Sequence, residues 1–199
     1  DRGFRFGDGV FETIRVEQGV PYQWDAHMER LASGLAALRI APPAIDWKML
    51  AKECLRRNAC RDGFLRMAIS RGVGSQGYRP LTTASPSIIV ELLPPSPPPP
   101  ALRVWSGNYR RPGCYTLPYG QKLAHGITST LALLEAEDHA CEEALVFSDT
   151  GIVCETASAN LFWLHDGLLY TPALSTGCVA GTTRQAVMRV SPFPMHEVE

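Results

Sequence analysis

The stretch that most constrains the fold is residues 144–184, ALVFSDTGIVCETASANLFWLHDGLLYTPALSTGCVAGTTR. It contains three apolar runs rich in β-forming residues, at Ala144–Phe147, Ile152–Leu164 and Leu168–Tyr170. The short gaps between them contain Asp and Gly, which supply the positive φ angles of tight hairpins. We therefore predict a meander of three strands.

One acid, Glu155, lies inside the central and most apolar of these runs. Burying a carboxylate is costly unless a cation or a strong donor meets it. After the meander, the sequence GTTR at 181–184 precedes a helix-like run at Gln185–Val190. The exposed backbone N–H groups of a helix start are suited to phosphate. An acid and a phosphate cradle in one segment indicate a phosphorylated cofactor with a cationic ring.

Size and charge limit the class of protein. The chain has 199 residues, of which 45% are hydrophobic and 20% charged, and its net charge is −1. This composition is typical of a globular protein with one ordinary domain or two small ones. There is no basic run that would attract nucleic acid or an anionic membrane, and no apolar stretch of the roughly 20 residues that span a bilayer.

The cysteines and histidines favour neither a metal site nor a disulfide framework. The six cysteines are scattered without a C-x-x-C pair, and the five histidines are isolated. A reducing cytoplasm is the compartment that this pattern favours. We find no signal peptide, and since the chain opens at Asp1 without Met, we expect its true start to lie elsewhere.

Hydrophobic periodicity divides the first half of the chain into alternating strands and helices. The predicted elements are a strand at Val10–Val16, a helix that Asp25 caps, a helix at Trp47–Asn58 that Asp46 caps, and strands at Phe64–Ser70 and Ser87–Leu93. The proline-rich run at 94–100 is an extended spacer. We therefore predict a small N-terminal domain at 1–93 and a larger domain at 101–199.

The second domain is predicted to begin with a strand at Ala101–Ser106 and to contain a helix at Thr130–Cys141, with an inner stripe of Leu131, Leu134 and Cys141. Between them, Lys122 lies in a loop rich in Pro and Gly. A single lysine is usually a surface residue, but a lysine in apolar surroundings has a lowered pKa and can act as an amine nucleophile.

Four motifs in one order carry a resemblance to a known family. They are GDGVFETIR at 7–15, Lys122, Glu155 and GTTR at 181–184. Together they resemble the fold-type IV pyridoxal-phosphate enzymes, which include branched-chain and D-amino-acid aminotransferases and 4-amino-4-deoxychorismate lyase. The resemblance covers Arg2 to Met188. It implies an α+β fold with a small N-terminal α/β domain and a larger β-rich domain containing a pseudo-barrel.

The resemblance also implies roles in binding pyridoxal 5′-phosphate. Lys122 resembles the lysine that holds the cofactor covalently, and Glu155, in the pattern ETASANLF, resembles the acid that pairs with the pyridine nitrogen. By itself Arg30 would be assigned to a solvated helix face, but within HMERL it matches the arginine that clamps the phosphate. The remaining cofactor contacts implied are Val179 on the ring and Gly181, Thr182 and Thr183 at the phosphate.

Within the family the sequence is most similar to the lyase. SRGVGSQGY at 70–78 resembles a lyase loop, and Thr13 matches a threonine implicated there in proton transfer. Substrate contacts are implied for Phe11, Arg15 and Arg66, and Arg66 stands where branched-chain aminotransferases carry an arginine. The predicted reaction is conversion of 4-amino-4-deoxychorismate to 4-aminobenzoate and pyruvate.

Two other functions remain open on the sequence alone. One is transamination of branched-chain or D-amino acids, and the other is a non-catalytic module that only binds phosphate or cofactor. In either enzyme the partner is a small amino substrate, and the resemblance implies a homodimer. It also implies that the chain lacks the family's first strand and most of its C-terminal part.

Overall fold

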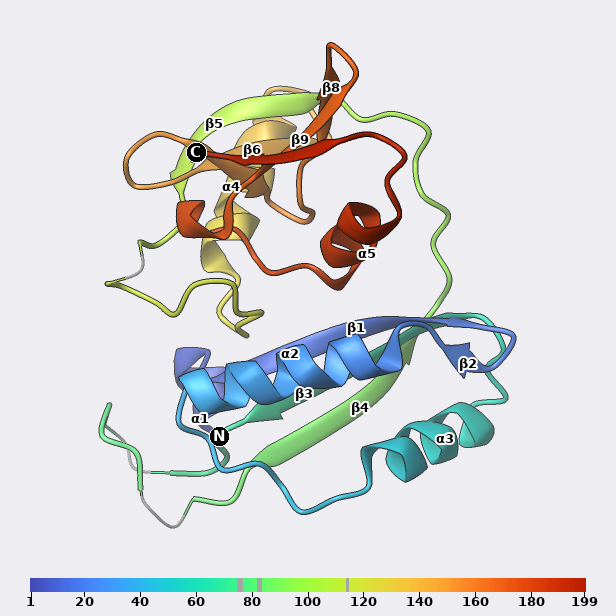
Figure 1. The fold of residues 1–199 in the computed structure, drawn as a ribbon. Coiled ribbons are helices and arrows are strands. Elements are labelled where there is room, and N and C mark those ends of the chain that lie inside the picture. The colour runs from blue at the N-terminus through green and yellow to red at the C-terminus, as the bar shows by residue number, and fades with distance from the viewer. Residues whose placement is uncertain (75–76, 82–83, 114) are drawn as a thin grey trace. The chain divides into compact units, whose positions relative to one another are not determined.

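The computed structural model describes residues 1–74, 77–81, 84–113 and 115–199. These form two compact units, which are shown in Figure 1 and described separately. Unit 1 comprises 1–98 and 121–125, and unit 2 comprises 99–120 and 126–199. The predicted division into two domains at the proline-rich run 94–100 stays a prediction. Across the described residues, no helix combines the length and apolar character that crossing a membrane requires.

Unit 1 is built on one antiparallel sheet with strand order β2-β1-β3-β4. Its elements in chain order are α1 (Arg2–Phe6), β1 (Gly9–Glu17), β2 (Val20–Pro21), α2 (Trp24–Ala37), α3 (Trp47–Arg57), β3 (Gly63–Ser70) and β4 (Ser87–Leu93). The three long strands lie within one or two residues of their predicted positions. The β-branched and aromatic side chains of these segments are typical of strands, which is why the sequence predicted them.

Strand periodicity gives the sheet of unit 1 two different faces. Ile14, Leu65 and Met67 are fully buried and form a core with residues of α3, including Ala51 and Leu55. Each large apolar side chain of this core contributes about 1.5–3 kcal/mol by leaving water. In Figure 1, α2 and α3 both lie against this face. The alternate residues point to the opposite face, which neither α2 nor α3 covers and which α1 contacts only at its Ser70 end.

The segment 121–125 returns to unit 1 and pairs with the edge of β1. Leu123 forms an antiparallel bridge with Val10. The N–H of Phe11 donates to the carbonyl of Lys122 at 3.2 Å, and the N–H of Ala124 donates to the carbonyl of Gly9 at 2.8 Å. Because β2 pairs only with the far end of β1, this edge is available. The pairing places Lys122 on β1, more than one hundred residues away in sequence.

Unit 2 contains two three-stranded sheets, of order β5-β6-β7 and β10-β9-β8. Its elements are β5 (Val104–Arg110), α4 (Ile127–Asp138), β6 (Glu143–Phe147), β7 (Val153–Thr156), β8 (Trp163–His165), β9 (Leu168–Pro172), η1 (Leu174–Thr176), α5 (Thr182–Val190) and β10 (Met195–Val198). The pairs β5–β6 and β9–β10 are parallel, and β6–β7 and β8–β9 are antiparallel.

The predicted three-stranded meander is wrong in its central strand. The run Ile152–Leu164 is divided between β7 and β8, which belong to different sheets. The chain turns after Thr156, whose N–H donates to the carbonyl of Ala159 and whose hydroxyl accepts from the N–H of Ala159. The hairpin turns are as predicted, because Gly151 has φ 87° and Gly167 has φ 74°. Apolar content alone did not reveal the break.

The helix predictions were less accurate at the termini and for one buried stripe. Asp46 caps α3 as predicted, accepting from the N–H of Met49 at 2.9 Å. Asp25 does not cap α2, which begins one residue earlier, at Trp24. In α4 the buried residues are Ala132 and Ala136, whereas Leu134 is 52% exposed. Small side chains let α4 approach its neighbouring sheet closely, which the preference for large apolar residues did not anticipate.

Candidate active site

The acid Glu155 lies on β7 and is 2% exposed. The Nη2 of Arg111 lies 2.6 Å from its Oε1. Its Oε2 accepts from the Nδ2 of Asn160 and from the backbone N–H of Val179, both at 3.1 Å. One cation and two N–H donors thus face the carboxylate, an arrangement that favours its ionised form.

Asn160 connects Glu155 to the start of α5. Its Nδ2 also donates to the carbonyl of Val179 at 2.8 Å. Its Oδ1 occupies the space that a Cβ on residue 181 would need, so any side chain there would displace Asn160. Gly181 is the N-cap of α5 and provides no side-chain cap to the helix's first turn. This helix start has the backbone donors and dipole that favour a phosphate.

The start of α5 is itself held in place by Arg184, which is buried. Its Nη2 donates to the carbonyl of Pro172 at 2.9 Å and to Oε2 of Glu197 at 2.7 Å. Thr182 is buried and Thr183 is exposed. Helix α5 is thereby anchored to β9 and β10.

In unit 1, the predicted catalytic and substrate residues lie on the sheet face opposite α2 and α3. Lys122 Nζ and the guanidinium carbon of Arg66 each lie 4.5 Å from the ring centroid of Phe11. Thr13 is the register partner of Arg66 across β1 and β3. Arg15 follows Thr13 at strand spacing. One face thus carries an amine, a hydroxyl and two guanidinium groups around an aromatic ring.

The two arginines on this face have acidic neighbours. Arg66 Nε lies 3.6 Å from Glu91 Oε1, and Arg15 Nη2 lies 3.6 Å from Glu17 Oε2. Both pairs are substantially exposed, and exposed pairs at such distances are weak. An anionic group of a substrate could therefore compete for either arginine at little cost.

Arg30 lies on the other side of the sheet, where α2 packs on β1. Its Nε and Nη2 donate to the two oxygens of Glu12 at 2.8 and 2.6 Å. The Nδ1 of His27 lies 2.7 Å from Glu12 Oε2. Burial raises the pKa of Glu12, but hydrogen bonds from Arg30 and His27 outweigh it, and the net pKa lies below the ordinary value. One edge of the guanidinium is thus committed to Glu12.

A second arginine cluster anchors the loop that resembles the lyases. Arg2 donates from Nη1 to the carbonyl of Gly77 at 2.9 Å and from Nη2 to that of Tyr78 at 3.0 Å. Its Nε and that of Arg71 both donate to Asp8 at 2.8 Å. Ser75 and Gln76 of the loop lie outside the described residues.

Reasoning from the sequence missed four residues of these clusters: Glu12, His27, Arg111 and Asn160. Three carried a signal, and one of these, His27, is the first residue of the HMERL motif. Glu12 shares the strand parity of the apolar residues Val10 and Ile14, which predicts a buried acid. Asn160 lies inside the ETASANLF motif. For Arg111 no such signal exists, because its partner is distant in sequence.

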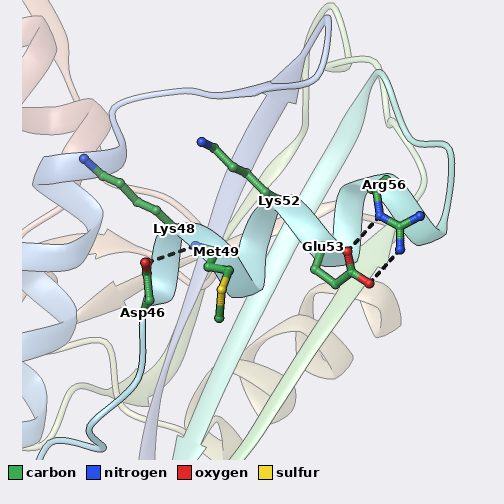
Figure 2. A pocket seen from close by; sticks show the side chains of 6 residues that line it. All are labelled: Asp46, Lys48, Met49, Lys52, Glu53 and Arg56. Atoms are coloured by element: carbon green, nitrogen blue, oxygen red, sulfur yellow. Dashed lines mark hydrogen bonds and ion pairs between the residues drawn. The ribbon is translucent and has the colours of Figure 1, made fainter.

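A surface hollow along α3 carries none of the predicted residues. Figure 2 shows it with its lining, which consists of Asp46, Lys48, Met49, Lys52, Glu53 and Arg56. Arg56 pairs with Glu53 at 2.7 Å, and both side chains are exposed. These are neighbouring side chains of one solvated helix, so we assign no ligand to this hollow.

Comparison with known proteins identifies the family. The family model described as amino-transferase class IV matches residues 9–198. The chain belongs to this family. A putative branched-chain-amino-acid aminotransferase of Methanocaldococcus jannaschii is 32% identical over 96% of this chain and 68% of its own length. An aminodeoxychorismate lyase of Vibrio harveyi is 31% identical over 94% of this chain and 70% of its own length.

Solved structures of class IV enzymes show the same fold. A putative 4-amino-4-deoxychorismate lyase from Legionella pneumophila superposes with a TM-score of 0.91 at 27% identity, covering 100% of this chain and 75% of that one. The T.th. branched-chain amino acid aminotransferase with pyridoxamine 5′-phosphate has a TM-score of 0.88 at 25% identity, covering 99% and 69%. The predicted α+β fold of type IV is confirmed.

This class IV chain is an enzyme that depends on pyridoxal 5′-phosphate. The residues present fit that group. Glu155 is an anion suited to a protonated ring nitrogen, and the uncapped start of α5 suits a phosphate. The alternative of a non-catalytic module is set aside. The roles of individual residues stay predictions.

Proposed function

We propose that this class IV enzyme is a lyase that converts 4-amino-4-deoxychorismate to 4-aminobenzoate and pyruvate. The observation that supports this most directly is the shared sheet face of Lys122 and Thr13. Lys122 contacts the ring of Phe11, which Arg66 also contacts, and Thr13 lies opposite Arg66 in the strand register. Elimination needs an amine to take a proton and a donor to return one to the leaving group.

In this proposal each residue has a separate task. The cofactor, when bound, supplies an electron sink. Lys122 Nζ holds the cofactor and then removes the proton from the substrate carbon that bears the amine. Thr13 or Lys122 delivers a proton to the departing enolpyruvyl group. Phe11 forms a wall of the substrate site.

The remaining roles concern binding and charge. Glu155 keeps the ring nitrogen protonated, and Val179 packs on the ring. Gly181, Thr182 and Thr183 bind the phosphate together with Arg30, whose guanidinium Glu12 holds in a fixed orientation. Arg15 and Arg66 bind the substrate carboxylates.

Release of pyruvate tests the reaction directly. Purified enzyme loaded with pyridoxal 5′-phosphate should release pyruvate from 4-amino-4-deoxychorismate with no added keto acid. Turnover that requires a keto-acid acceptor would instead support transamination. That second candidate is favoured by Arg66 and by the 32% identity to the Methanocaldococcus jannaschii protein.

The cofactor lysine has an independent optical test. Lys122→Ala should abolish the visible absorption band of the covalently bound cofactor. Lys48→Ala is the matched control, because Lys48 is an exposed lysine on α3 that lies 3.9 Å from Asp25. An unchanged band in Lys122→Ala would remove Lys122 from the mechanism.

Assembly and location are also proposals. We propose a homodimer in a reducing cytoplasm, supported by the family resemblance and by the five described cysteines, all of which are free thiols. Light scattering of the purified protein tests the first part.

A further inference from the structure

Arg111 is the cation that meets Glu155, yet neither a sequence motif nor the family resemblance assigns it a task. It follows directly after β5, and its backbone N–H donates to the carbonyl of Phe147 at the end of β6 at 2.7 Å. Strand β6 pairs with β7 so that Val146 lies opposite Glu155. Because β6 lies between β5 and β7 in the sheet, this pairing brings the guanidinium of Arg111 close to the carboxylate of Glu155.

Three donors to Glu155 differ in kind. Asn160 and Val179 present neutral N–H groups to Oε2, whereas Arg111 presents a cation to Oε1. A cation close to a carboxylate favours its ionised form far more than a neutral dipole does. A guanidinium stays protonated at all ordinary pH values, so it places a permanent positive charge beside the carboxylate.

Two further titratable groups beside Glu155 are thiols that stay neutral. Burial raises the pKa of Cys154 to about 11 and also raises the pKa of Cys178. Cys154 donates to the carbonyl of Thr176 at 2.7 Å. Neither thiol adds a negative charge that would oppose ionisation of Glu155 at neutral pH.

We propose that Arg111 is a positioning residue that keeps Glu155 ionised, so that the proton shared with the cofactor resides on the pyridine nitrogen and not on the carboxylate. The inference rests on the proposed pairing of Glu155 with that nitrogen. A protonated ring withdraws electrons strongly, whereas a neutral ring hydrogen-bonded to a carboxylic acid does so weakly. Arg111 would therefore set the strength of the electron sink without contacting the cofactor.

The test measures where the proton lies. The protein is loaded with pyridoxal 5′-phosphate labelled with ¹⁵N in the ring, and the ¹⁵N chemical shift reports protonation independently of turnover. We expect the shift of a protonated pyridine in the unmodified protein. In Arg111→Gln it should move toward that of neutral pyridine, and Arg111→Lys should restore most of the protonated signal.

The matched control is Arg103→Gln. Arg103 also pairs with a glutamate at 2.6 Å in unit 2, but both it and Glu142 are exposed. This variant should leave the ¹⁵N shift unchanged. Melting curves of all variants without cofactor report folding, and Arg111→Lys, which keeps a cation, covers the case in which Arg111→Gln does not fold.

The possible failures are distinguishable. If Glu155→Gln itself leaves the ¹⁵N shift unchanged, the proposed pairing of Glu155 with the ring is wrong. If Glu155→Gln moves the shift while folded Arg111→Gln keeps the protonated signal, the pairing stands and the role of Arg111 is overturned. Loss of the protonated signal in Arg103→Gln would also overturn it, because the effect would then not be specific to Arg111.

Discussion

Two buried glutamates, one in each unit, meet arginine in different ways. In unit 1, Glu12 receives both edge nitrogens of Arg30 and a ring nitrogen of His27. In unit 2, Glu155 receives Nη2 of Arg111 and two neutral N–H groups. A bidentate pair matches two oxygens with two donors and joins α2 to β1. Glu155 instead faces a cation at one oxygen and neutral dipoles at the other.

The difference indicates how a buried acid can serve stability or chemistry. Glu12 and Arg30 form a closed pair whose main effect is to hold a helix and the orientation of a guanidinium. Glu155 has a cation at Oε1 and neutral dipoles at Oε2, which suits its proposed pairing with a cationic ring. Four predictions test this contrast, beginning with the largest expected effect.

Replacing Glu155 by Gln should slow turnover on the order of 10²- to 10³-fold, the usual cost of losing a preorganised electrostatic contact. The proposed phosphate contacts at α5 are untouched, so the cofactor should still bind. Steady-state kinetics and the absorption of bound cofactor measure the two effects. Near-normal turnover would count against the assigned role of Glu155.

Replacing Glu12 by Gln should lower the free energy of unfolding by about 3–5 kcal/mol, because it leaves the largely buried Arg30 without its anion. Denaturant titration measures this. Glu17→Gln is the control, since Glu17 belongs to an exposed pair, and it should change stability by about 0–1 kcal/mol. Equal effects of the two variants would show that burial of the Glu12 pair is unimportant.

Lowering the pH should remove part of the unfolding free energy that the Glu12 pair contributes. The folded-state pKa of Glu12 lies below its ordinary value of 4.5, so its contribution is present above that pH and is lost as pH falls through the lowered pKa. Asp8, held by Arg71 and Arg2 against the opposing effect of burial, behaves in the same way below 3.8. Melting temperatures between pH 6 and acid conditions should fall less steeply in Glu12→Gln.

The smallest effect is expected from Gly181→Ala, at about 1–3 kcal/mol of overpacking. Its φ of −64° suits any residue, so the cost is steric and falls on Asn160. Displacing Asn160 removes one donor from Glu155 but not Arg111. The ring ¹⁵N shift should therefore stay close to that of the unmodified protein while the unfolding free energy declines.

Local patterns were sufficient for much of the fold. Alternation predicted β1, buried-looking apolar runs predicted β3 and β4, and Asp46 predicted the start of α3. Local patterns failed where packing against another element determined which residues form a strand or become buried. The run Ile152–Leu164 is apolar enough for one strand, but its two ends pair in different sheets. Helix α4 buries alanines because close approach to the sheet, and not side-chain size, determines which residues are covered.

The sequence by itself determined the family, the fold type and the cofactor, because the motifs around Lys122, Glu155 and α5 are short, ordered and chemically specific. Only the tertiary structure decided which partners those residues have. The pairing of Arg111 with Glu155 and of Arg30 with Glu12 joins positions 44 and 18 residues apart through β-sheet register and helix packing. Such contacts depend on strand register and helix packing over many residues, and no local sequence pattern predicts them.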